Sequence, residues 1–94
     1  MTIVWSRAAL LDVDEIGDFL AAIDPVVERR TLARIRERAS SLATYPGLGR
    51  PGRVPGTREL VVSGTSFVLV YRECRGHVEI ANVLHGARRW PETF

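Results

Sequence analysis

Arginine supplies most of the side chains of this 94-residue chain that could bind or react with a ligand, because all 13 basic residues are arginine and none is lysine. A guanidinium group forms forked hydrogen bonds with carboxylate and phosphate groups, but it keeps its proton and is a poor general base. The chemistry that these residues offer is therefore the binding of anionic groups. A GC-rich coding bias would produce the same composition without any function.

The charge is unevenly distributed along the chain. Residues 1–45 hold six arginines against seven acidic residues, and residues 46–94 hold seven arginines against four. The excess of positive charge in residues 46–94 suits an acidic protein partner as well as a nucleic acid. Five arginines follow the second predicted helix, and we interpret them as a solvated face paired in part with Glu28 and Glu37, with a nucleic-acid surface as the alternative. They are Arg29, Arg30, Arg34, Arg36 and Arg38.

Two of the arginines, Arg50 and Arg53, lie in a stretch dominated by glycine and proline. Residues 45–56 read YPGLGRPGRVPG, a composition that disfavours both a helix and a strand ladder. A phosphate-binding loop is conceivable, but no strand precedes it, no Lys-Ser or Lys-Thr pair follows it, and no helix begins after it. We expect a linker within one domain.

Other chemically useful groups are few. Cys74 is the only cysteine, so it can form neither an internal disulfide nor a metal site by itself. We predict no metal and no cofactor. No apolar run approaches the ~20 residues of a membrane span, and no signal-peptide pattern follows Met1. We therefore expect a cytoplasmic protein without a membrane partner.

The region that must position these groups is a predicted β-hairpin over residues 57–72, TRELVVSGTSFVLVYR, because valine, phenylalanine, leucine and tyrosine dominate both arms. Gly64 and Thr65 are expected to form a two-residue loop, with Gly64 first in a type II′ turn. The resulting pairs are Arg58 with Tyr71, Leu60 with Leu69, and Val62 with Phe67, all on one face. The other face carries Glu59, Val61, Ser63, Ser66, Val68 and Val70. A bulged turn would exchange the faces.

The preceding residues predict one strand and two helices. A short strand at an edge covers residues 2–5, and Ser6 caps a helix over residues 7–23. Asp24 and Pro25 end this helix and start a second one, which reaches about Ala43. Helical spacing predicts the buried residues Val13, Ile16, Leu20, Ile23, Leu32, Ile35, Ala39 and Leu42, and the water-facing residues Asp12, Asp14, Glu15 and Asp18.

A third strand over residues 77–84 completes the order β-α-α-β-β-β. This order predicts an α+β fold in which an N-terminal strand and a two-helix hairpin pack on a small antiparallel sheet. The length suits one domain over residues 1–94. Its parts are a helical hairpin at 7–44, the Gly/Pro loop at 45–56, the sheet at 57–85 and a tail at 86–94, in which Trp90 is expected to pin the tail to the sheet or to a helix.

Several segments together resemble the ParE branch of the RelE/ParE toxin superfamily, over roughly residues 3–91. They are a first strand ending in tryptophan, a two-helix hairpin, PGRVPGTREL, a strand ending VLVYR, and VLHGARRWP. The resemblance implies a RelE/ParE-like toxin of a type II toxin–antitoxin pair, bound by a cognate antitoxin in a hetero-oligomer. It implies contact with operator DNA only indirectly, through the antitoxin. The ParE branch implies poisoning of DNA gyrase, whereas the RelE branch cuts mRNA on the ribosome.

The residue types favour binding over RNA cleavage. Attack by a 2′-hydroxyl needs a base, an acid and positive charge at the phosphate. In RelE-like nucleases, lysines, arginines and a tyrosine supply these groups on the outer hairpin face and just after the last strand. Here there is no lysine, and the outer positions are Glu59, Val61 and Val68. Arg88 or Arg89 matches the C-terminal basic position, but Trp90-Pro91 stands where the tyrosine usually follows.

Some relatives instead use a histidine near the end of the last strand with an arginine and a glutamate, which His85, Arg58 and Glu59 match in type. On the predicted pairing, however, His85 and Arg58 lie toward opposite ends of the sheet, and Arg58 and Glu59 point to opposite faces. We favour no catalytic residues and keep His85, Arg58, Arg88 and Arg89 as the nuclease alternative. His85 could also be structural or contact the target. Arg58 is expected to anchor the Gly/Pro loop or an antitoxin carboxylate, and Tyr71 to be an aromatic residue at the core edge.

The apolar outer face of the hairpin predicts a docking site for a partner. A disordered acidic antitoxin tail could fold across it, and the alternative occupant is the chain's own segment 88–94. The predicted antitoxin contacts are Arg50, Arg53, Val61, Val68, Val70 and Arg72, and the predicted target contacts are His85, Arg88, Arg89 and Trp90. Three functions remain: a gyrase-binding toxin, a ribosome-dependent mRNA endonuclease, or a toxin-fold protein with weak or altered activity.

Overall fold

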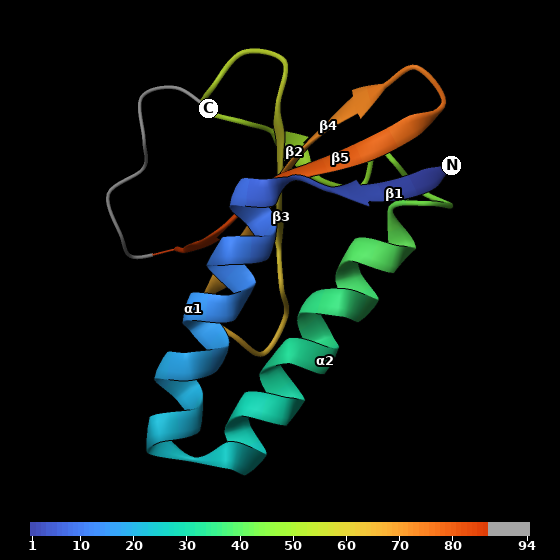
Figure 1. The fold of residues 1–94 in the computed structure, drawn as a ribbon. Coiled ribbons are helices and arrows are strands. Elements are labelled where there is room, and N and C mark those ends of the chain that lie inside the picture. The colour runs from blue at the N-terminus through green and yellow to red at the C-terminus, as the bar shows by residue number, and fades with distance from the viewer. Residues whose placement is uncertain (87–94) are drawn as a thin grey trace.

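The computed structural model describes residues 1–86, which form two helices against one five-stranded sheet (Figure 1). The elements are β1 (Thr2–Trp5), α1 (Arg7–Ile23), α2 (Pro25–Ser41), β2 (Arg50–Pro51), β3 (Arg58–Val61), β4 (Phe67–Cys74) and β5 (His77–His85). The predicted α+β fold is confirmed. Two features of the sheet were not predicted.

The helix boundaries follow from local capping. The Ser6 hydroxyl accepts a hydrogen bond from the Ala9 N–H at 3.0 Å, and the Asp24 carboxylate accepts one from the Val26 N–H at 2.9 Å. Pro25 occupies the first turn of α2, where its missing N–H costs nothing. The predicted span of α1 is confirmed, and α2 ends two residues before the predicted Ala43.

The sheet has the order β1-β5-β4-β3-β2 and is mixed. The antiparallel pairing predicted within residues 57–85 is confirmed, but the prediction gave no pairing for the N-terminal strand. β1 pairs in parallel with β5, with Ile3 opposite Val78, whereas the other neighbours are antiparallel. Parallel neighbours require a long crossover connection. The chain between β1 and β5 contains the helical hairpin, which lies on one face of the sheet (Figure 1), and the three other strands.

The second such feature is β2, because the Gly/Pro loop was expected to contain no strand. Arg50 pairs with Glu59 and Pro51 with Arg58 at the outer edge of β3. A proline is tolerated at a sheet edge because its nitrogen can face away from the neighbouring strand. Two residues of the loop therefore extend the sheet.

The predicted hairpin register is confirmed, although its turn is not the predicted one. Arg58 lies opposite Tyr71 and Leu60 opposite Leu69. The Thr65 N–H donates to the Val62 carbonyl at 3.1 Å, so Gly64, with φ of 78°, takes the second central position of the turn instead of the first. The loop is longer than expected but is centred on the same point, and the register is therefore unchanged.

The core lies between the helices and the sheet face that carries Leu60, Leu69 and Tyr71. Val13, Ile16, Leu20 and Leu32 pack against this core, and Ile35, Ala39 and Leu42 are fully part of it. Ile23 was expected to be buried but is 67% exposed. It lies in the last turn of α1, at the tip of the helical hairpin and away from the sheet (Figure 1).

No helix within residues 1–86 has the length and apolarity needed to cross a membrane.

Candidate functional site

A buried carboxylate, Glu59, organises the outer face of the hairpin. Its side chain is 2% exposed, and its oxygens lie 3.2 Å from Arg50 Nη2 and 3.9 Å from Arg53 Nε. The Arg53 backbone N–H also donates to it at 2.9 Å. A buried charge needs such partners. Glu59 therefore fixes the Gly/Pro loop, while the side chains of Arg50 and Arg53 remain 63% and 54% exposed.

The same loop is held on the inner face by Tyr71. The Tyr71 hydroxyl donates to the Pro46 carbonyl at 2.7 Å and accepts from the Gly49 N–H at 2.8 Å. Arg58 Nη1 donates to the Gly49 carbonyl at 2.9 Å. Arg58 therefore anchors the loop, which is one of the two roles expected for it. Tyr71 is fully buried, not at the core edge as predicted.

This environment raises the pKa of Tyr71. Burial is the main cause, because it disfavours the charged phenolate. The hydrogen bond from Gly49 and the positive charge of Arg58 act in the opposite direction, and the carboxylate of Glu73 adds to the increase. Burial therefore favours the protonated hydroxyl, the form that donates to the Pro46 carbonyl.

The continuous exposed valine surface predicted on the outer face is not present. Val61 is 49% exposed, but Val68 and Val70 are 6% and 0% exposed. Arg72, predicted as an antitoxin contact, forms an ion pair with Glu79 at 2.7 Å. A shallow hollow of about 450 Å³ remains on this face. Its lining residues are Arg50, Arg53, Val61, Thr65, Ser66, Phe67, Val68 and Gly86.

His85 is separated from the other candidate nuclease residues. It pairs with Phe67 at one end of β4, whereas Arg58 pairs with Tyr71, four residues farther along that strand. At ~3.3 Å per residue, Arg58 and His85 are offset by about 13 Å along the strand direction. His85 Nε2 lies 2.9 Å from Ser66 Oγ, and the ring meets Phe67 edge to face at 5.4 Å. His85, Arg58 and Glu59 do not form one site.

The helix side of His85 borders a separate hollow of about 280 Å³ beside α1. Its other lining residues are Asp12, Glu15, Ile16, Phe19, Phe67, Val83 and Leu84. Within residues 1–86, no group of three histidine, cysteine, aspartate or glutamate side chains is placed to hold a metal ion. The predicted contacts Arg88, Arg89 and Trp90, and the segment 88–94 as a possible cover of the valines, lie outside the described residues.

Sequence reasoning missed two contacts between a helix and the sheet. Arg34 Nη1 donates to the Ser63 carbonyl at 3.0 Å, and Arg38 Nε donates to the Val61 carbonyl at 3.3 Å. The expected ion pairs of the α2 arginines with Glu28 or Glu37 do not form among the described residues. The four-residue spacing of Arg34 and Arg38 places both on the helix side that faces the hairpin.

Asp12 was expected to face water but instead holds α1 to β5. Its Oδ2 atom accepts hydrogen bonds from the Val83 N–H and the Asn82 side chain, both at 2.9 Å. The register between β4 and β5 shifts beside these contacts, so that Ala81 is an extra residue in β5. The Ser6 hydroxyl donates to the Ala81 carbonyl at 2.8 Å. The start of α1 therefore satisfies backbone groups that the bulge leaves unpaired.

Comparison with known proteins gives consistent family matches. Residues 3–90 match the family described as the ParE toxin of the type II toxin–antitoxin system, parDE. The chain is 42% identical over 90 residues to the putative toxin Y4kP of Sinorhizobium fredii, and the match covers 96% of this chain and 93% of that protein. It is 36% identical over 86 residues to toxin RelE2 of Caulobacter vibrioides, covering 92% and 96% respectively.

Among solved structures, the fold is similar to that of a chain from the chromosomal ParDE toxin–antitoxin system of P. aeruginosa. The TM-score is 0.80 at 28% sequence identity, and the match covers 90% of this chain and 95% of the other.

Proposed function

Because this chain belongs to the ParE toxin family of type II toxin–antitoxin systems, we propose that it inhibits DNA gyrase by binding and that a cognate antitoxin neutralises it. The proposed site of action is the cytoplasm. The antitoxin, not the toxin, makes the contact with operator DNA in this proposal.

The observation that carries binding over catalysis is the state of the outer hairpin face. Glu59 is buried and held by two arginines, Val61 is apolar, and Arg72 is paired with Glu79. RNA cleavage needs a group that can take a proton from the 2′-hydroxyl. An arginine can hold a phosphate but does not act as a base at neutral pH.

The alternative is a ribosome-dependent mRNA endonuclease, and one specific observation favours it. A relative 36% identical to this chain is named toxin RelE2. His85 would be the acid or base, with its imidazole beside the Ser66 hydroxyl. Against this alternative, Arg58 lies about 13 Å away along the sheet. A toxin-fold protein with weak or altered activity is the third possibility.

The exposed arginines of the outer face support an acidic antitoxin as partner. Arg50 and Arg53 border the hollow of about 450 Å³, together with Val61. Glu59 holds both guanidinium groups at the rim while leaving more than half of each side chain exposed. Acidic side chains of a partner can approach these arginines without first burying them.

The test is a supercoiling assay with purified gyrase, into which the antitoxin-free chain is titrated, beside a ribosome-bound mRNA cleavage assay. We expect loss of supercoiling, or trapped cleaved DNA, with intact mRNA. Adding the cognate antitoxin should restore supercoiling. Cleaved mRNA with unaffected gyrase would establish the nuclease instead, and no effect in either assay would favour the third possibility.

A further inference from the structure

Two arginines of α2 cross to the edge of the hairpin that β2 leaves uncovered. Arg34 Nη1 donates to the Ser63 carbonyl, and Arg38 Nε donates to the Val61 carbonyl. Both carbonyls lie beyond the end of β2, which pairs only with the first half of β3. α2 therefore runs along this edge and places guanidinium groups on it.

Arginine occupies three positions of α2 that are four residues apart. Residues at this spacing share one side of a helix and lie about 6 Å apart along its axis. Arg30 and Arg38 therefore lie one turn on either side of Arg34. Arg30 is exposed, and it takes part in none of the ion pairs within residues 1–86.

The edge of the hairpin continues this spacing. The two residues whose carbonyls accept from α2 are two positions apart, or about 7 Å along the strand. Two positions farther along β3, the buried carboxylate of Glu59 lies 3.2 Å from Arg50 Nη2, and the Arg50 side chain is 63% exposed. We call the following residues the arginine row: Arg30, Arg34, Arg38 and Arg50. Its members follow one another at intervals of about 6–7 Å.

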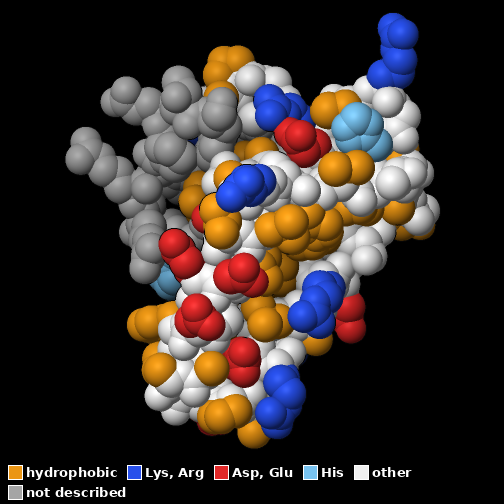
Figure 2. Space-filling view, viewed as in Figure 1, with side chains coloured by type: hydrophobic (Ala, Val, Ile, Leu, Met, Phe, Trp, Pro, Cys, Tyr) orange, Lys and Arg blue, Asp and Glu red, His pale blue; other side chains and the backbone are white. Residues whose placement is uncertain are grey.

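Few carboxylates are placed to neutralise the arginine row. Glu28 faces α1 instead, because a Cβ atom at Gly17 of that helix would lie 3.7 Å from its carboxylate. In Figure 2, acidic side chains gather over α1, and none of the ion pairs within residues 1–86 joins them to α2. Glu59 is the only acidic residue among these ion pairs that contacts a member of the row. The row therefore presents an excess of positive charge.

The even spacing favours a nucleic acid as the ligand of the arginine row. A guanidinium group forms forked hydrogen bonds with phosphate, and a nucleic-acid strand repeats one phosphate at every nucleotide. The carboxylates of an acidic protein segment have no such fixed interval. A row of four evenly spaced arginines therefore matches a phosphate backbone more closely than it matches a protein.

We propose that the arginine row binds the phosphate backbone of duplex DNA without reading the base sequence. In the proposed function this DNA is the duplex that gyrase holds, so the choice of DNA rests on that function. The contact holds the toxin at the complex of gyrase and DNA, in addition to its contact with the enzyme. Operator DNA is still recognised by the antitoxin.

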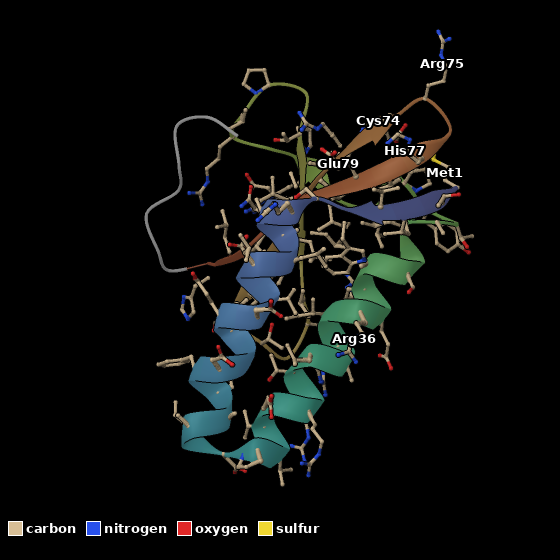
Figure 3. All side chains as sticks on the ribbon, viewed as in Figure 1. Met1, Arg36, Cys74, Arg75, His77 and Glu79 are labelled. Carbon is tan, nitrogen blue, oxygen red and sulfur yellow. The ribbon has the colours of Figure 1, made fainter. Side chains whose placement is uncertain are left out.

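Two arginines of α2 provide a matched test. The antitoxin-free chain is titrated into a fluorescent duplex of about 20 base pairs at about 50 mM salt, and anisotropy reports binding. Arg30→Gln should weaken binding about 5-fold or more, because one phosphate loses its partner. Arg36→Gln makes the same change in net charge on the same helix and should stay within about 2-fold. Arg36, labelled in Figure 3, is two positions from Arg34 and borders the hollow between α1 and α2, so it lies off the row.

The salt dependence of binding counts the phosphate contacts. Each contact with duplex DNA contributes about 0.9 to the slope of log K against log salt concentration, so four arginines predict a slope of about −3.6. Arg30→Gln should reduce the size of this slope by about 1, whereas Arg36→Gln should leave it unchanged. A variant that merely folded less well would bind more weakly with the original slope.

Substitutions of Arg38 separate its charge from its support of the hairpin. Arg38→Gln removes both, whereas Arg38→Lys keeps the charge. Arg38→Lys should therefore retain most of the salt slope, and Arg38→Gln should reduce its size by about 1. Circular dichroism and the melting temperature verify that the variants fold.

The supercoiling assay links the arginine row to gyrase. Arg30→Gln should need about 3-fold or more protein than Arg36→Gln for the same loss of supercoiling, because its contact with the DNA is weaker. Equal potency of the two variants would show that inhibition does not use the row and would overturn the inference.

Failure of this inference is distinct from failure of the proposed function. If gyrase is inhibited but the duplex does not bind, or if both glutamine variants weaken DNA binding equally, only the inference about the row is overturned. If gyrase is unaffected, the proposed function fails, and the DNA titration decides the row by itself. Tighter binding of single-stranded RNA would overturn the choice of DNA and favour the nuclease. Displacement of the duplex by polyglutamate at equal charge concentration would assign the row to an acidic protein partner and also overturn the inference.

Discussion

The Tyr71 hydroxyl and the Gly49 backbone are in direct contact where the Gly/Pro loop packs on the sheet. The Gly49 N–H donates to this hydroxyl at 2.8 Å. A Cβ atom at position 49 would lie 2.8 Å from the Tyr71 ring, from its hydroxyl and from the Glu59 carbonyl. The loop approaches the sheet so closely here that only glycine fits without movement.

Gly49→Ala should therefore destabilise the fold by about 1–3 kcal/mol, because an added methyl group must displace the backbone or the buried ring. Urea unfolding followed by circular dichroism measures the change. Gly47→Ala is the matched control, since a Cβ there meets nothing within 4 Å. Equal stability of the two variants would contradict the close packing at Gly49.

Tyr71→Phe should lower the free energy of unfolding by about 1–3 kcal/mol, because it leaves the Gly49 N–H and the Pro46 carbonyl without their partner.

The same substitution should alter how the free energy of unfolding depends on pH. Folding raises the pKa of Tyr71 above its usual 10.0, so the unfolded chain loses this proton first. The free energy of unfolding should then fall as the pH rises above 10.

Comparison of urea midpoints at neutral and alkaline pH isolates this contribution. Tyr71→Phe should weaken the alkaline decrease, whereas Tyr45→Phe, at a residue 64% exposed, should retain it. An unchanged decrease in Tyr71→Phe would assign the alkaline sensitivity to other groups.

Glu59→Gln should destabilise the fold by about 1–3 kcal/mol, because the neutral amide loses the charge-assisted contacts to Arg50 and Arg53. The loop should also loosen, with faster hydrogen exchange at the Arg53 amide. Glu37→Gln is the control: Glu37 is exposed on α2, and its substitution should change stability by less than about 0.5 kcal/mol. A neutral effect of Glu59→Gln would show that the ion pairs do not hold the loop.

His85→Gln tests the choice between binding and cleavage. Glutamine can still form a hydrogen bond with Ser66 but cannot exchange a proton near neutral pH, so gyrase inhibition should stay within about 3-fold. A nuclease that used His85 would lose about 10²- to 10⁴-fold in mRNA cleavage. His77→Gln, at the other end of β5, is the control. Lost gyrase inhibition by the folded variant would make His85 a target contact.

The features that the sequence alone determined depend on near neighbours. The span of α1 followed from the Ser6 cap, and the start of α2 followed from Asp24-Pro25. The hairpin register survived a wrong turn assignment because the two arms are symmetric about the same loop centre. Such features need only the residues within one turn or one hairpin, and the pattern of side chains expresses them directly.

The tertiary structure alone decided the features that join distant parts of the chain. Asp12 meets Val83 across 71 positions, and Arg38 meets Val61 across 23. The parallel pairing of β1 with β5 and the burial of Val68 and Val70 are of the same kind. A charged or apolar residue shows what it can bind but not which group folding places beside it, because tertiary packing sets that distance. The candidate site changed accordingly, from an exposed valine face to arginines that Glu59 holds at the rim of a shallow hollow.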